Sequence, residues 1–147
     1  MKINEFDDIS INGQFDLIFK EKCQEHPKIN WKLLKSLAFN ESALQPFVSG
    51  GLFRIPERLF FEYSGIDPTD PSDSIKTIFL IFSEWWEKLS YIPENDRLLF
   101  IILAYKMRFF DVNKITKISN KFDDLYQFIA PGLLLEVKKI VDRAEVM

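Results

Sequence analysis

The sequence predicts an all-α fold, or an α-dominated α+β fold, built as a single domain. The chain has 147 residues, of which 47% are hydrophobic and 28% are charged, so it is long enough to form one hydrophobic core. Five glycines and seven prolines are few for an all-β protein, which turns about every ten residues. Apolar residues recur at helical spacing, and no convincing strand-like alternation is present.

The helices expected in the first half of the chain are marked by residues that begin or end helices. His26-Pro27 ends the first, because the residue before a proline avoids the helical conformation. Asn30 is expected to cap the second with its side chain, and Pro56 suits the first turn of the third. In chain order, these helices are expected at residues 15–25, 31–42 and 56–63.

Two long helices are expected in the second half. The turn-forming stretch Ser64 to Asp73 precedes the first of them, residues 74–90, with Ser72 and Asp73 as its caps. The second, residues 93–110, is apolar on almost every side from Leu98 to Ala104, which predicts a buried central helix.

Shorter helices are expected after this central helix. Asp111 is expected to cap one that runs to Asn120, and residues 123–129 form another. Pro131-Gly132 then opens a last amphipathic helix.

Charge and composition exclude several classes of protein. A net charge of −3 argues against general binding of nucleic-acid phosphates. One cysteine and one histidine argue against a zinc site. We also expect no other metal and no cofactor. The longest apolar run, Leu98 to Tyr105, has eight residues. A transmembrane helix needs about 20, so membrane insertion is not expected.

Glu41 breaks the pattern of its predicted helix. At about 100° per residue it returns to within about 20° of Leu34, and it shares a face with Trp31 and Ala38. We expect this face to be buried and Glu41 to lie at its end. Partial burial disfavours the ionised form of a carboxyl group and so raises its pKa. The general acid that cleaves a glycosidic bond must be protonated near neutral pH, which a raised pKa allows. Alternatively, Glu41 turns outward to solvent, as many glutamates near helix ends do.

The residues around Glu41 resemble the active-site segment of a known enzyme family. The run Asn30 to Ser42, which ends in Glu-Ser, is similar to the active-site helix of soluble lytic transglycosylases and goose-type lysozymes. Gly51 to Pro56 is similar to that family's Gly-Leu-Met-Gln-Ile-x-Pro segment, and Asp96 to Tyr105 to its helix that ends in Ala-Tyr-Asn. The resemblance extends from about Phe15 to Lys117 and implies a lysozyme-like helical domain.

The resemblance implies that Glu41 cleaves the β-1,4 bond between N-acetylmuramic acid and N-acetylglucosamine in peptidoglycan. Glu41 would act first as acid and then as base, closing a 1,6-anhydro ring, whereas attack by water would give lysozyme-type hydrolysis. Glu136 lies in the last predicted helix, where some family members keep a second acidic residue. The residues implied in substrate binding are Ser42, Ser49, Arg54, Tyr105 and Lys106.

Two of these residues differ from the family pattern. Arg54 stands in place of a sugar-binding glutamine, and Lys106 in place of an asparagine. Positive charge there would favour the ionised form of Glu41, or would suit the carboxylates of peptide stems. Tyr105 is alternatively a core ring, and Ser42 a local hydrogen-bonding residue. The alternative function is a catalytically inactive lysozyme-like module that binds glycan or serves as a structural plug.

The start of the chain bears on delivery to the cell wall. The first twenty residues carry four acidic residues and no apolar block after a basic start, unlike a signal peptide. We therefore expect synthesis in the cytoplasm and action in the periplasm or cell wall, after carriage by a phage tail or an injection machine. Residues 1–14 are expected to form a polar docking arm, and residues 15–147 a single lysozyme-like domain. Alternatively, a native export signal has been trimmed.

Overall fold

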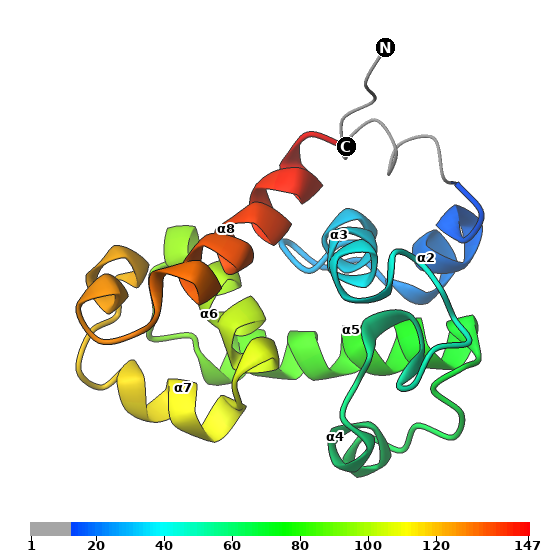
Figure 1. Cartoon of the computed structure of the whole chain (residues 1–147), viewed down its shortest axis with the longest axis horizontal. Coiled ribbons are helices and arrows are strands. Elements are labelled where there is room, and N and C mark those ends of the chain that lie inside the picture. The colour runs from blue at the N-terminus through cyan, green and yellow to red at the C-terminus, as the bar shows by residue number, and fades with distance from the viewer. Residues whose placement is uncertain (1–12) are drawn as a thin grey trace. The chain divides into compact units, whose positions relative to one another are not determined.

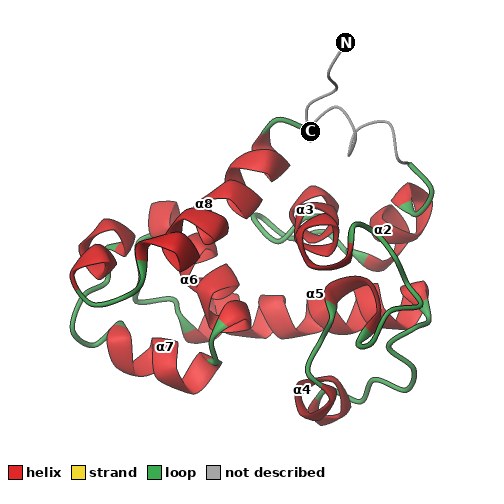
Figure 2. Cartoon of the chain, viewed as in Figure 1, coloured by secondary structure: helices red, strands yellow, loops and turns green. Residues whose placement is uncertain are grey.

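Residues 13–147, which the computed structural model describes, contain α-helices and 3₁₀-helices and no strand (Figures 1 and 2). The all-α prediction is confirmed. The expected polar arm at residues 1–14 lies almost wholly outside the described residues. The elements are α2 (Asp16–Lys22), α3 (Trp31–Ser42), η1 (Gly51–Phe53), α4 (Glu57–Glu62), α5 (Pro71–Lys88), α6 (Glu94–Lys106), α7 (Phe109–Ile115), η2 (Phe122–Gln127) and α8 (Pro131–Glu145).

The chain divides into two compact units. The first ends at Ile81 and also includes Arg143–Met147, so it contains α2, α3, η1, α4 and the start of α5. The second, Phe82–Asp142, contains the end of α5, then α6, α7, η2 and most of α8. Helices α5 and α8 therefore contribute residues to both units. The single domain expected over residues 15–147 stays a prediction.

Helix α3 of the first unit is buried along most of its length. Its cap is the predicted one, because the Asn30 side chain accepts a hydrogen bond from the backbone N–H of Leu33 at 3.1 Å. All six residues from Leu33 to Ala38 are buried. Helical spacing predicts a buried face on this helix, and the burial extends beyond that face.

The first unit also buries two positive charges. Lys35 of α3 is 2% exposed, and its Nζ lies 2.8 Å from Oδ1 of Asp16 in α2. Arg143, at the end of α8, is 1% exposed, and its guanidinium lies 5.0 Å from the centre of the Phe39 ring. A buried charge is tolerated when such neighbours compensate for the lost hydration.

In the second unit, α6 is the most deeply buried element. Residues Phe100 to Tyr105 are all buried, whereas Leu98 and Leu99 are half-buried. Tyr105 meets the Phe82 ring edge-on, with 5.8 Å between ring centres. A lysozyme-like arrangement around α6 stays a prediction. Within residues 13–147, no helix combines the length and the apolar character needed to cross a membrane.

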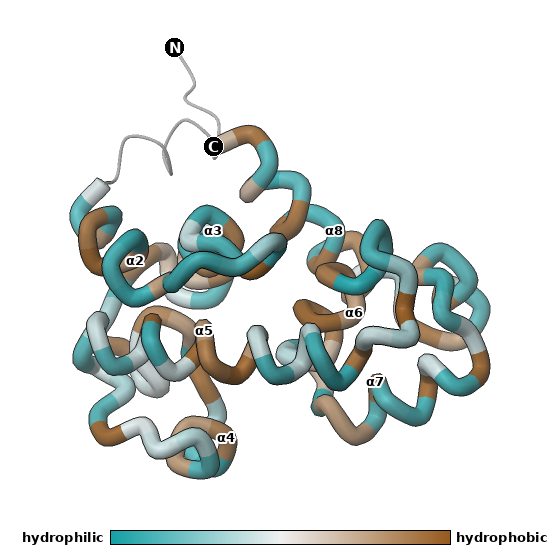
Figure 3. Tube along the Cα trace, turned by 180° about the vertical axis from the view of Figure 1, so that it is seen from behind, coloured by the Kyte–Doolittle hydropathy of each residue, from teal (hydrophilic) through white to brown (hydrophobic). Residues whose placement is uncertain are grey.

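The last predicted helix is present as α8. Hydrophilic and hydrophobic residues alternate in bands along it (Figure 3), as expected for a helix that packs one face against other residues. Leu134, Val137 and Ile140 recur at helical spacing, and all three are fully buried.

The predicted boundary between the central helix and the next helix is wrong. Helix α6 ends at Lys106 rather than at Phe110, because Met107 leaves the helical conformation (φ −101°, ψ −97°). Asp111 therefore lies inside α7 and does not cap it. Its carboxylate instead accepts a hydrogen bond from Nε of Arg108 at 3.0 Å. The segment predicted at residues 123–129 is the 3₁₀-helix η2.

The predicted caps of the preceding long helix are also wrong. Helix α5 begins at Pro71, since proline suits a first helical position, where its missing N–H costs no hydrogen bond. Asp73 lies inside the helix, and its Oδ2 accepts hydrogen bonds from the backbone N–H groups of Ile66 (2.8 Å) and Asp67 (2.7 Å). The carboxylate thereby fastens the preceding turn to the first turn of α5.

Arg97 is buried at the connection between α5 and α6. Its Nε donates a hydrogen bond to the carbonyl oxygen of Ile92 (3.1 Å), and its Nη2 donates to those of Ser90 (3.0 Å) and Ile92 (2.8 Å). The guanidinium lies 4.2 Å from the centre of the Trp86 ring. The side chain thus gives hydrogen-bond partners to two carbonyl groups outside the helices, which burial would otherwise make costly.

Replacing Arg97 by methionine is expected to lower the free energy of unfolding by about 2–4 kcal/mol, because two carbonyl groups lose a charged donor. Urea unfolding followed by circular dichroism measures this. The control is Arg108→Met, which removes an arginine whose side chain is 75% exposed, and we expect a loss below about 1 kcal/mol. Equal losses for the two variants would contradict the assignment.

Candidate functional site

Glu41 lies one residue before the end of α3. Of the residues expected to share its helix face, Leu34 and Ala38 are fully buried, whereas Trp31 and Glu41 are half-buried. Glu41 is therefore neither a core residue nor a fully exposed one. Glu41 takes part in an interaction within the protein.

Ser42 ties the end of α3 to the next segment. Its Oγ lies 2.6 Å from the carbonyl oxygen of Leu52 and 3.1 Å from that of Ala38, and it accepts a hydrogen bond from the backbone N–H of Gln45 at 3.1 Å. The side chain is buried, and these neighbours use its hydrogen-bonding capacity. This geometry gives Ser42 a structural role, the alternative considered for it from the sequence.

Two glycines shape the turn that follows. Gly50 (φ 81°) and Gly51 (φ 72°) adopt the left-handed conformation that favours glycine. A Cβ atom on Gly51 would lie 1.7 Å from the carbonyl oxygen of Pro68, so no larger residue fits there without movement of the chain. Arg54, at the end of η1, is also left-handed (φ 47°), which is uncommon for a residue with a side chain.

Ser49 and Arg54, two of the predicted binding residues, line one pocket of the first unit. Its volume is about 500 Å³, within the usual range for small-ligand sites. The remaining lining residues are Gly50, Ile55, Pro56, Glu57, Phe61 and Pro68. Glu41 does not line this pocket, but its neighbour Ser42 is bonded to Leu52 in the same turn.

Tyr105 and Lys106, the other predicted binding residues, end α6 in the second unit. Tyr105 is 8% exposed, which agrees with the alternative interpretation of this residue as a ring of the core. Lys106 is half-buried, and its Nζ lies 3.5 Å from Oε2 of Glu136 in α8. The carboxylate of Glu136, the acidic residue noted in the last helix, therefore balances the charge of Lys106.

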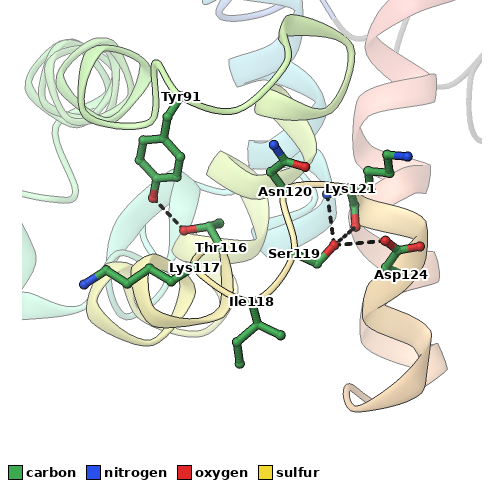
Figure 4. A pocket seen from close by; sticks show the side chains of 8 residues that line it. All are labelled: Tyr91, Thr116, Lys117, Ile118, Ser119, Asn120, Lys121 and Asp124. Atoms are coloured by element: carbon green, nitrogen blue, oxygen red, sulfur yellow. Dashed lines mark hydrogen bonds between the residues drawn. The ribbon is translucent and has the colours of Figure 1, made fainter.

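A second pocket, of about 370 Å³, lies in the second unit and has no counterpart in the sequence prediction (Figure 4). The Tyr91 hydroxyl lies 2.5 Å from Oγ1 of Thr116. Ser119 Oγ bonds Oδ2 of Asp124 (3.0 Å) and accepts from the backbone N–H of Lys121 (3.2 Å). The hydroxyl groups of this pocket thus bond to other residues of the chain. Its lining also includes Lys117, Ile118 and Asn120.

The single histidine and the single cysteine have structural surroundings. His26 Nδ1 accepts hydrogen bonds from the backbone N–H groups of Lys28 (3.1 Å) and Ile29 (2.9 Å), which closes the turn after α2. Burial raises the pKa of the Cys23 thiol to about 12. Among residues 13–147, no three histidine, cysteine, aspartate or glutamate side chains are grouped to hold a metal ion.

The chain has no significant match among known proteins: no family model, no curated protein and no solved structure. The resemblance to lytic transglycosylases therefore stays a prediction.

Replacing Gly51 by alanine is expected to destabilise the protein by about 3 kcal/mol or more, because the new Cβ clashes with the Pro68 carbonyl and the backbone conformation is strained. Thermal unfolding followed by circular dichroism measures the loss. Gly132→Ala is the control, since a Cβ atom there meets nothing within 4 Å and alanine favours the helix. A Gly51 variant as stable as the Gly132 variant would show that the turn is not fixed by this contact.

The Cys23 thiol is expected to react with iodoacetamide at pH 8 at least about 100-fold more slowly in the native protein than in urea. The thiolate is the reactive form, and a pKa raised from 9.0 to about 12 lowers its population at every pH below that value. Mass spectrometry of samples quenched over time gives both rates. Equal rates would mean that the native thiol is exposed and unshifted.

Proposed function

We propose that this chain is a peptidoglycan-cleaving enzyme of the lytic transglycosylase or lysozyme type, with Glu41 as its single acid and base. The observation that carries the proposal is the half-burial of Glu41 at the end of α3, next to a serine that fixes the following glycine turn. A carboxyl group in this position is partly shielded from water but is still accessible, as a general acid must be.

In the proposed reaction, the protonated Glu41 donates its proton to the oxygen that bridges N-acetylmuramic acid and N-acetylglucosamine. The bond from C1 to that oxygen breaks, and positive charge develops at C1, where the sugar's own acetamido group can assist. The Glu41 carboxylate then accepts the proton of the muramoyl 6-hydroxyl, whose oxygen attacks C1 and closes the 1,6-anhydro ring. Attack by water instead would give hydrolysis. The reaction needs no metal or cofactor.

Four of the predicted binding residues are proposed to contact the glycan directly. Ser49 and Arg54 are proposed to contact it from the pocket that they line in the first unit. Ser42 is proposed to position Glu41 rather than to bind sugar, because its hydroxyl is bonded to Leu52. Tyr105 and Lys106 are proposed as contacts from α6, and Lys106 would bind substrate beside or in place of Glu136.

Peptidoglycan lies outside the cytoplasmic membrane, so the proposal requires that the protein reach the periplasm or the cell wall. We propose that a phage tail or an injection machine delivers it, which would make a component of that assembly its protein partner.

A catalytically inactive lysozyme-like module is the second candidate. The observations that favour it are the bonded hydroxyl of Ser42 and the ion pair of Lys106, since both use groups that would otherwise meet sugar. In this role the chain would bind glycan without cleaving it, or would fill a structural place in a tail or injection assembly.

Wild-type protein is expected to clear a suspension of purified sacculi and to release 1,6-anhydro muropeptides, whereas Glu41→Gln is expected to be at least about 1,000-fold slower. Glutamine keeps the size of the side chain but neither donates nor accepts the proton. Turbidity and mass spectrometry of the products are the readouts.

The matched control is Glu62→Gln, an exposed residue of α4 outside the pocket, which is expected to retain wild-type activity. Equal lysis by wild type and Glu41→Gln would exclude Glu41 as the catalytic residue. Glycan binding by both proteins without lysis by either would support the inactive module.

A further inference from the structure

The pocket of the first unit is lined by two exposed residues of opposite charge, Arg54 and Glu57. Within residues 13–147, neither side chain takes part in an ion pair or a side-chain hydrogen bond. Arg54 ends η1 and Glu57 begins α4, three positions later, and yet the two side chains do not pair with each other. One pocket thus offers a cation and an anion to a ligand at the same time.

Part of the remaining lining is apolar. Pro56, Phe61 and Pro68 supply hydrocarbon surface, and Phe61 is 51% exposed. A half-exposed ring beside two prolines is suited to contact with aliphatic side chains. The pocket therefore combines two charges with an apolar wall.

The backbone that carries Arg54 is fixed before any ligand binds. The N–H of Arg54 donates to the carbonyl of Gly51 at 3.1 Å, and the N–H of Ile55 donates to that of Gly50 at 3.1 Å. The left-handed conformation of Arg54 is an unfavourable one that these bonds hold in place. A fixed wall loses little conformational entropy when a ligand binds, and this favours affinity.

We infer that this pocket binds a short peptide segment that carries both a free carboxylate and a free ammonium group. The Arg54 guanidinium is suited to the carboxylate, which it can bind through two parallel hydrogen bonds. Glu57 pairs with the ammonium group, and the aliphatic side chains lie against Phe61 and the prolines. A volume of about 500 Å³ accommodates a ligand of this size.

The pair of charges selects this ligand over others. A polyanion would be repelled by Glu57, and a neutral sugar alone would leave both charges without partners. This proposal rests on the proposed function. Glycan strands that carry peptide stems would then be the preferred substrate, because such stems carry free carboxylates and amines.

Binding is tested on the full chain by isothermal titration with alanyl-alanine, its N-acetyl derivative and its C-terminal amide. We expect the free dipeptide to bind at least about 10-fold more tightly than either capped form. Arg54→Gln and Glu57→Gln are each expected to weaken binding by a similar factor, and Arg54→Lys, which keeps the charge but loses the planar fork, to weaken it less.

Matched controls lie on α4, the short helix that begins with Glu57. Arg58→Gln and Glu62→Gln change the same charges outside the pocket and are expected to bind the dipeptide within about twofold of wild type. Equal binding of the free and capped dipeptides, or no binding at all, would overturn the inference. An equal loss of affinity in the control variants would overturn it as well, because net charge would then be the cause.

A second experiment separates the inference from the proposed function. Glycan strands with intact stems are expected to be cleaved at least about 10-fold more efficiently than strands stripped of stems by an amidase, and Arg54→Gln is expected to lose this preference. Dipeptide binding without any cleavage would refute the proposed function and leave the peptide site standing. Equal cleavage of both strands without dipeptide binding would refute the peptide site alone.

Discussion

The close approach of Gly51 to the carbonyl oxygen of Pro68 is the constraint on which the candidate site of the first unit depends. This contact leaves no room for a side chain, and it holds the turn after α3 against the loop before α5. The hydroxyl of Ser42, bonded to Leu52, attaches the end of α3 to the same turn. The position of Arg54 follows from this contact, because Arg54 ends the fixed segment, and Glu41 lies at the end of the helix to which the segment is bonded.

Elements with strong local signals could be predicted from the sequence, and those set by distant contacts could not. Helix α3 begins and ends where its cap and its apolar spacing indicate, because Asn30 needs only the N–H of Leu33 three residues away. The chain leaves the helical conformation at Met107 without a proline or glycine nearby that would predict the end of α6. Asp73 has the composition of a cap, but its carboxylate bonds backbone groups six and seven residues earlier in the chain.

The same division applies to the candidate site. The half-burial of Glu41 follows from helix geometry, whereas the pairing of Lys35 with Asp16 and of Lys106 with Glu136 depends on which helices pack together. Glycines in a turn predict positive φ angles, but the sequence does not predict a positive φ at an arginine such as Arg54. The residues that line the pocket of the second unit are typical of polar loops in general. Their composition therefore could not predict a pocket there.

The buried cations change the electrostatic character of the protein's surface. Lys35, Arg97 and Arg143 are buried, whereas no acidic side chain of residues 13–147 falls in the buried class. The net charge of −3 counts these cations in full, so the surface that faces solvent is more acidic than that value indicates. Repulsion from an anionic polymer reaches over a Debye length of about 10 Å at 0.1 M salt. The protein should therefore approach such polymers faster as ionic strength rises, the reverse of a nucleic-acid-binding protein.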